Sequence, residues 1–110
     1  TEYVSQVLGK VRRFAKVSGC HVWFVAHPMK LQRDKKGKRP APGPYDISGS
    51  AHWANKADFA ITVHRPGDHG TITEIHIAKV RHKWLGKKGT VKLRYIVATG
   101  EYSGDLEGLG

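Results

Sequence analysis

The sequence predicts an α/β domain with a parallel sheet, and three observations carry this prediction. Residues 2–18 place apolar side chains at helical spacing, residues 21–26 form a continuous apolar run, and a short turn at Gly19 joins them. An apolar run without alternation is typical of a strand covered on both faces. A helix that feeds such a strand is typical of a parallel α/β sheet. A length of 110 residues suits one domain with a modest core.

The helix over residues 2–18 is expected from its two faces. Apolar residues recur along one face, and the basic residues Lys10, Arg12, Arg13 and Lys16 fall mostly on the other. Thr1 is a candidate N-cap, and Gly19 is a candidate stop. The sequence therefore predicts an amphipathic helix that packs one side against the domain.

The rest of the chain divides into a loop and a set of strands. Residues 28–45, rich in proline, glycine and lysine, have no periodicity and predict a basic mobile loop. Residues 50–57 are expected to form one or two helical turns capped by Ser48 or Ser50, followed by a second apolar strand over 59–64. Residues 71–80 and 90–98 predict a terminal antiparallel hairpin, and 101–110 a flexible tail.

The charge of the chain predicts an anionic partner. Nineteen Lys and Arg residues against nine Asp and Glu give a net charge of +10. This excess favours nucleic acid, nucleotide or an acidic surface, and a basic surface kept for solubility is the alternative. One cysteine excludes an intrachain disulfide and suits a reducing cytoplasm, and no apolar stretch is long enough to span a membrane.

His27 and the basic loop are the first candidate binding residues. His27 ends the apolar run 21–26, where an open α/β sheet binds ligands, and its ring can donate a hydrogen bond to a phosphate oxygen. A satisfied structural histidine is the alternative. The loop cations suit contact with a phosphate backbone, and a solvated loop is their alternative. The loop cations are Lys30, Arg33, Lys35, Lys36, Lys38 and Arg39.

Two further clusters carry donors for an anion. Ser48, Gly49 and Ser50 open a helical segment, where backbone amides free of bulky side chains can approach a phosphate closely. A capping motif alone is the other interpretation. Lys79 and Arg81 lie two apart on a strand and therefore face the same side, as a clamp for an anion or as an exposed basic face.

A metal site and a complete nucleotide site are both disfavoured. The histidines have poor ligand spacing and no cysteine pair supports them, so no metal ligand is predicted. The chain contains no G-x-x-x-x-G-K-[ST] motif and no apolar strand ending in Asp or Glu that would hold Mg²⁺. If the chain handles a nucleotide, we expect it to supply only part of the site.

The order of these clusters resembles the C-terminal part of the RecA-like core of the DnaB-family replicative DNA helicases. The closest likeness is to the phage primase-helicase and Twinkle branch. The motifs that carry it are "FVAHPMKL", "YDISGSAHWANKADFAITVHR", "IHIAKVR" and "LRYIVATGEY" in this order, and they cover nearly the whole chain. The loop "HKWLGKKG" after Arg81 departs from the family pattern by being longer and more basic.

The resemblance implies an ATP-dependent 5′→3′ helicase whose subunits form a ring, with ATP bound between neighbours. It implies that His27 senses the γ-phosphate and that Arg81 is an arginine finger with Lys79 as its companion. It implies that Lys30 and residues 48–50 contact single-stranded DNA, steadied by Asn55, Lys56 and Asp58. ATP and Mg²⁺ would be cofactors of the full-length parent, and this fragment alone would bind neither.

The resemblance also sets expectations for partners and extent. We expect neighbouring helicase subunits in a hexamer, a primase as a further partner, and the cytoplasm of a bacterium or phage-infected cell. Residues 1–110 would be a partial RecA-like core cut from a longer protein, inactive as an ATPase without the phosphate-binding loop. A free-standing basic nucleic-acid-binding domain without ATPase activity is the main alternative, and a filament-forming recombinase-type core is a third.

Overall fold

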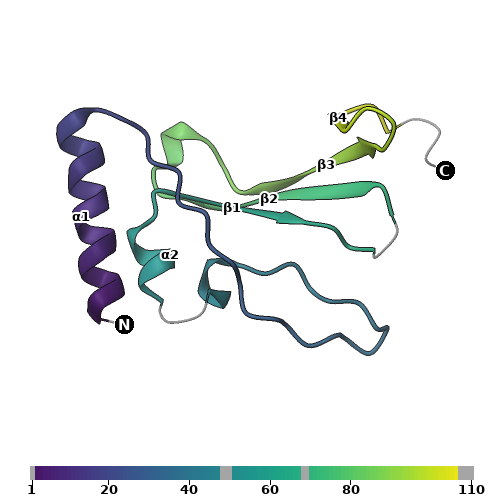
Figure 1. Cartoon of the computed structure of the whole chain (residues 1–110), viewed down its shortest axis with the longest axis horizontal. Helices are drawn as coiled ribbons and strands as arrows, with labels where there is room; N and C mark the ends of the chain where they lie inside the picture. The colour runs from purple at the N-terminus through teal and green to yellow at the C-terminus, as the bar shows by residue number, and fades with distance from the viewer. Residues whose placement is uncertain (1, 48–50, 68–69, 107–110) are drawn as a thin grey trace.

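The fold is described from a computed structural model, which describes residues 2–47, 51–67 and 70–106. Two α-helices, two short 3-10 helices and four strands follow one another in these ranges (Figure 1). In chain order they are α1 (Glu2–Ser18), η1 (Pro44–Asp46), α2 (His52–Lys56), β1 (Phe59–His64), β2 (Ile72–Val80), η2 (Lys83–Leu85), β3 (Gly89–Ile96) and β4 (Glu101–Ser103). The α/β class is therefore confirmed.

Helix α1 has the predicted extent and the predicted end. Leu8, at the middle of its apolar face, is buried, and α1 packs on α2. Gly19 adopts a left-handed φ of 67°, and the Cys20 amide donates to the Ala15 carbonyl at 3.1 Å. This six-to-one bond across a left-handed glycine is a Schellman ending, which glycine forms without a Cβ clash. Thr1, the candidate N-cap, lies outside the described residues.

The sheet is antiparallel throughout, which corrects the prediction of parallel strands. Its order is β1-β2-β3-β4, and each neighbouring pair is antiparallel. The β2–β3 pairing confirms the hairpin predicted for 71–80 and 90–98. The strand predicted for 59–64 forms as β1, but it pairs antiparallel with β2 and lies at the sheet edge, with alternate residues exposed. The short turn after His64 brings the chain straight back as β2, which dictates the antiparallel pairing.

The apolar run 21–26 does not form the predicted buried strand. Residues 21–25 are exposed, including Trp23 at 73% and Val25 at 87%. Beyond this run, Pro28 and Ile47 make an isolated antiparallel bridge. A strand needs a neighbour for its backbone groups, and among the described residues β1 is already paired with β2 on its one bonded side. Sequence pattern detects an apolar run but not whether a neighbour exists to cover it.

The remaining segments differ from expectation in detail. Helix α2 begins after Ala51 with no side-chain cap hydrogen bond, so neither Ser48 nor Ser50 is its N-cap residue, and both lie outside the described residues. Where a flexible tail was expected from Glu101, residues 101–103 form β4 beside β3, with Gly100 at φ 74° making the tight turn. Of the loop predicted over residues 28–45, residues 28–43 are irregular and include an ordered turn around Asp34, whereas residues 44 and 45 belong to η1.

The described residues bury little apolar surface. Only Leu8, Ala54 and Thr73 are buried among them, and each keeps some exposure. The Cα radius of gyration is 16.4 Å, whereas a compact domain of this length has about 13 Å. On one sheet face Val63, Ile75 and Val91 lie opposite one another in register, and Val63 and Val91 are more than half exposed. The fold is thus held by local elements and polar contacts more than by a core.

We expect the α1–α2 contact to depend on Leu8. Leu8 is 8% exposed, and replacing a buried Leu with Ala costs about 2–5 kcal/mol; with so open a surrounding we expect the lower end of that range. Urea denaturation followed by circular dichroism measures the loss. Val17→Ala is the matched control, because Val17 lies on the same helix at 81% exposure. Equal losses in the two variants would contradict the assigned packing.

Candidate functional site

Three cations from two distant parts of the chain converge on the C-terminal end of α2. The Lys79 ammonium donates to the Ala54 carbonyl at 2.6 Å, and Arg81 Nη2 donates to the Asn55 carbonyl at 2.6 Å. Arg12 Nη1 on α1 donates to the Lys56 carbonyl at 3.3 Å. The last carbonyls of a helix have no partners within the helix and carry partial negative charge, so cations stabilise this end. We call Arg12, Asp58, Lys79 and Arg81 the hub.

Asp58 is the anion at the centre of the hub. Its Oδ1 lies 2.9 Å from Arg81 Nε and 3.6 Å from Arg12 Nη2. The backbone reinforces this arrangement, because the Arg81 amide donates to the Asp58 carbonyl at 2.8 Å. The start of β1 and the end of β2 are thereby tied to α1 and α2, with three cations to one carboxylate.

The hub changes the acid–base behaviour of Lys79. Burial lowers the pKa of Lys79 below its usual value, and the neighbouring Arg81 and Arg12 cations lower it further, while Asp58 opposes the shift. The Lys79 ammonium donates hydrogen bonds to two backbone carbonyls, those of Ala54 and, at 3.5 Å, Asn55, and such bonds favour the charged form. An added anion at this place would favour the charged form.

The basic loop is organised by one tight turn at its tip. Asp34 accepts hydrogen bonds at Oδ1 from the amides of Lys36 at 2.8 Å and Lys38 at 2.9 Å, and Gly37 turns with φ 79°. Arg33 Nη1 donates to the Gly37 carbonyl at 2.7 Å, so this predicted DNA residue helps to close the turn. Lys35 and Lys36 stand exposed at the tip. The base of the loop contacts the sheet through Thr62 Oγ1, which donates to the Pro42 carbonyl at 2.8 Å.

Lys30 and His27 lie at the other end of this loop. Both are exposed, and no hydrogen bond or ion pair engages either side chain within the described part of the chain. Lys30 borders an open groove between residues 28–31 and 39–42, which His64 also lines. An exposed ammonium at the edge of a groove is accessible to a phosphate. His27 has access to solvent but is not brought near the hub residues Lys79 or Arg81 by any described contact.

The stretch around 48–56 is described only in part. Ser48, Gly49 and Ser50, the predicted amide cradle, lie outside the described residues. Asn55 and Lys56 form the last turn of α2, where their carbonyls accept from the hub cations. The Asn55 side chain is exposed and the Lys56 side chain half-buried. The hub therefore holds the helix that directly follows residues 48–50.

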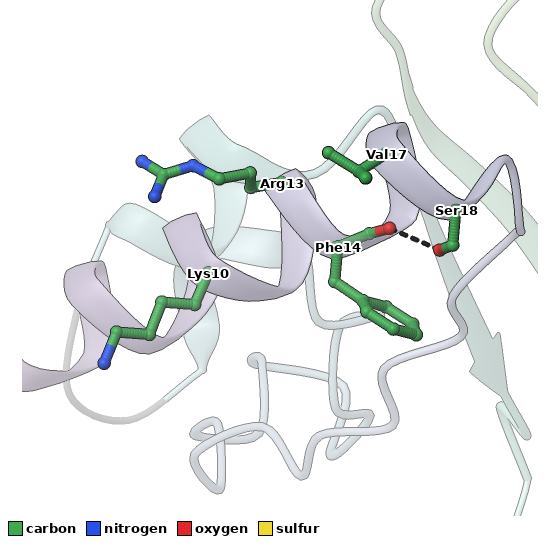
Figure 2. A pocket seen from close by; sticks show the side chains of 5 residues that line it. All are labelled: Lys10, Arg13, Phe14, Val17 and Ser18. Atoms are coloured by element: carbon green, nitrogen blue, oxygen red, sulfur yellow. Dashed lines mark hydrogen bonds between the residues drawn. The ribbon is translucent and has the colours of Figure 1, made fainter.

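A second open groove runs along α1 itself. Lys10, Arg13, Phe14, Val17 and Ser18 line it, with the two cations toward one end and Phe14 and Val17 toward the other (Figure 2). Ser18 Oγ donates to the Phe14 carbonyl, an ordinary hydroxyl contact in the last turn of a helix. None of the predicted site residues lines this groove, so it adds nothing to the hub or the loop.

The described residues hold no group of three or more His, Cys, Asp or Glu side chains placed for a metal ion. His76 instead bonds Glu74 at 2.9 Å and Thr90 at 3.1 Å. No helix in the described ranges is long and apolar enough to cross a bilayer.

Sequence reasoning missed two residues that the structure makes prominent. Arg12 joins the hub although it lies 44 positions from Lys56, and nothing in a helical charge pattern marks one arginine among its neighbours. Trp84 stacks on His82 in the β2–β3 connection, with a ring separation of 4.6 Å. Its signal was present in "HKWLGKKG", where an aromatic residue stands among lysines.

Comparison with known proteins supports the resemblance drawn from the motifs. No protein-family model matches the chain. The chain is 50% identical over 107 residues to the Twinkle homolog protein, chloroplastic/mitochondrial, of Arabidopsis thaliana. The match covers 94% of this chain and 15% of that protein, so the chain spans a small part of its relative's length. The chain is therefore similar to a segment of a Twinkle-type protein, one that is named for chloroplasts and mitochondria rather than for a bacterium or phage.

We expect the pKa of Lys79 to respond to its neighbours with defined signs. Arg81→Gln should raise the pKa of Lys79 toward its usual value, because one neighbouring cation is removed, and Asp58→Asn should lower it further. Because the pKa of Lys79 is lower in the folded chain than in the unfolded chain, its contribution to stability increases as pH rises through the interval between the two pKa values.

NMR titration of ¹³C-methylated lysines measures these shifts, with the Lys79 resonance of the urea-unfolded chain as the reference. A Lys79 resonance that titrates at the same pH in the folded and unfolded chain, or that is unmoved by Arg81→Gln, would contradict the hub geometry.

Proposed function

We propose that this chain is part of an ATP-dependent 5′→3′ replicative DNA helicase with a RecA-like core. The observation that carries the proposal is the 50% identity to the Twinkle homolog protein across 94% of the chain. The motifs that resemble the DnaB family follow the family's order along this stretch, and they identify the residues to which roles are assigned below. The proposed parent assembles as a ring, a hexamer, with ATP between neighbouring subunits and a primase as a further partner.

The hub suits the phosphate side of such an ATP site. Lys79 and Arg81 project from one strand end, supply ammonium and guanidinium donors, and are positioned by Asp58 and by α2. ATP bound there would supply the phosphoanhydride that drives the motor, and these side chains would bind and orient its phosphates. The hub fits Mg²⁺ less well than it fits phosphate, because its one carboxylate, Asp58, is already paired with two arginines. We therefore assign Mg²⁺ to residues outside this chain.

Single-stranded DNA is the proposed ligand of the loop residues. Lys30, Lys35 and Lys36 are exposed cations on one irregular segment, and a backbone reader needs such cations without base-specific geometry. Arg33 would act by shaping the loop through its bond to Gly37 as well as by its charge. We retain Ser48, Gly49 and Ser50 as proposed backbone contacts, with Asn55 and Lys56 on the helix that the hub holds.

A basic nucleic-acid-binding domain without ATPase activity remains the second candidate. The exposed lysines at the loop tip and the net charge of +10 favour it independently of any ATP site. The two candidate functions make different predictions about the natural gene product that contains these residues. A helicase requires a phosphate-binding glycine loop in that product and DNA-stimulated ATP hydrolysis, and a simple binder requires neither.

The finger role of Arg81 is tested in the full gene product. Arg81→Ala should reduce DNA-stimulated kcat by about a thousandfold or more, since a finger arginine supplies this much. ATP binding, measured by fluorescence with a labelled nucleotide, should change little.

Arg12→Ala is the matched control, because Arg12 also caps α2 and contacts Asp58 but is not proposed to reach the nucleotide. An equal loss of kcat in both variants would indicate that Arg81 has a structural role and is not an arginine finger.

The contribution of Lys30 is tested through salt dependence. Lys30→Ala should weaken single-stranded DNA binding and reduce the slope of log K against log salt by about 0.7, the value for one phosphate contact on a single strand. Fluorescence anisotropy with a labelled oligonucleotide measures both. Lys10→Ala on α1 is the control, as an exposed lysine away from the loop. An unchanged slope in Lys30→Ala would remove this residue from the DNA contact.

A further inference from the structure

The β2–β3 connection concentrates exposed positive charge that the proposed function does not use. Every residue from 82 to 92 is exposed. Between Arg81 and Lys92 there is no Asp or Glu, so no carboxylate within this segment offsets its positive charge. The cations of this segment are Lys83, Lys87, Lys88 and Lys92. Such a stretch attracts a polyanion.

An aromatic pair stands in the middle of this charge. His82 and Trp84 stack with ring centroids 4.6 Å apart and planes inclined by 25°. Trp84 is nevertheless 79% exposed, so most of the indole faces solvent. Leu85 beside it is 57% exposed. A flat aromatic ring supported on one side and open on the other is the geometry on which a nucleobase stacks.

The connection is held in place at its base and within its turn. At the base, Arg81 bonds Asp58 through its backbone amide at 2.8 Å and lies 2.9 Å from the same residue through Nε. Within the turn, the Leu85 amide donates to the His82 carbonyl at 3.0 Å, forming η2. Gly86 then takes φ 156° and ψ −168°, a region in which residues with a Cβ are strained. Trp84 is therefore presented from an ordered turn.

We propose that residues 82–88 form a separate binding site for single-stranded nucleic acid, in which Trp84 stacks on a base and Lys83, Lys87 and Lys88 neutralise phosphates. Figure 1 shows this connection at the end of the sheet near α1, whereas the tip of loop 28–43 extends toward the opposite side. The site needs no ATP, so it goes beyond the helicase proposal and does not depend on it.

An anionic membrane surface is the other partner that attracts Trp and Lys together. The structure favours nucleic acid, because η2 has only three residues and offers Trp84 and Leu85 as its exposed apolar side chains. Interfacial membrane binding usually needs a longer amphipathic face with several apolar residues. The stacked imidazole adds a π surface that suits a base and gives no advantage in lipid.

The test compares two probes of equal length and charge: a fluorescent oligo-dT, and the same strand made abasic. The natural gene product should bind oligo-dT about tenfold tighter than the abasic strand, as expected for stacking of one base. Trp84→Leu should bind both probes equally, and Trp84→Phe should keep most of the preference. Replacing Lys83, Lys87 and Lys88 with Gln should weaken both probes and reduce the salt slope by about two.

Trp23→Leu is the matched control, because Trp23 also follows a histidine two positions earlier, contacts it at 4.8 Å and is 73% exposed, but has apolar neighbours. It should leave the preference for bases unchanged. The proposal is overturned if Trp84→Leu retains the wild-type preference. It is also overturned if that variant loses binding to anionic phosphatidylserine vesicles while both oligonucleotide affinities stay unchanged. Lys30→Ala reports on the helicase proposal by its salt slope, so the two can fail separately.

Discussion

The arrangement of this chain depends on the carbonyl groups at the end of a five-residue helix. Helix α2 is too short to be stable alone, and its last carbonyls accept from Lys79, Arg81 and Arg12, which come from β2 and α1. A charged donor at such a carbonyl contributes about 1.5–3 kcal/mol, more than a neutral hydrogen bond. With only three buried residues among those described, these contacts decide how α1, α2 and the sheet are joined.

The same contacts connect the two halves of the proposed function. Lys79 and Arg81 are the cations assigned to a nucleotide, and α2 directly follows the residues assigned to DNA. A phosphate oxygen that competes for Arg81 would take it from the Asn55 or Ala57 carbonyl, now 2.6 Å and 3.2 Å away. Such an exchange would release the end of α2. A nucleotide at Arg81 and a DNA strand at the residues before α2 would then both shift the conformational equilibrium of this helix. This shared effect on α2 would couple the binding of the two ligands.

Sequence and structure agree where a signal is local. The period of residues 2–18 predicted α1 and Gly19 predicted its end, because helix faces and left-handed caps are properties of a few neighbouring residues. The alternation in 71–80 predicted β2 for the same reason. The prediction of a buried strand over 21–26 was wrong. A continuous apolar run forms such a strand only where neighbouring elements cover both of its faces, and the described elements do not cover this run. Arg12 in the hub was unpredictable, since its partners are set by packing between α1 and α2 rather than by spacing.

Two groups of cations in this chain differ in what they contact. Arg12, Arg33, Lys79 and Arg81 donate to backbone carbonyls and hold turns or helix ends in place. Lys30, Lys35, Lys36, Lys83, Lys87 and Lys88 are exposed, and within the described residues no hydrogen bond or ion pair of their side chains is found.

The cations that give the net charge of +10 therefore differ in their availability to an anion. Structural cations already have oxygen partners, so an incoming anion must displace a carbonyl to bind them. The exposed lysines give up only water and counterions, whose release favours binding. We therefore expect a nucleic-acid strand to contact the loop 28–43 and the β2–β3 connection first. The hub cations would bind only an anion that displaces the α2 carbonyls from them.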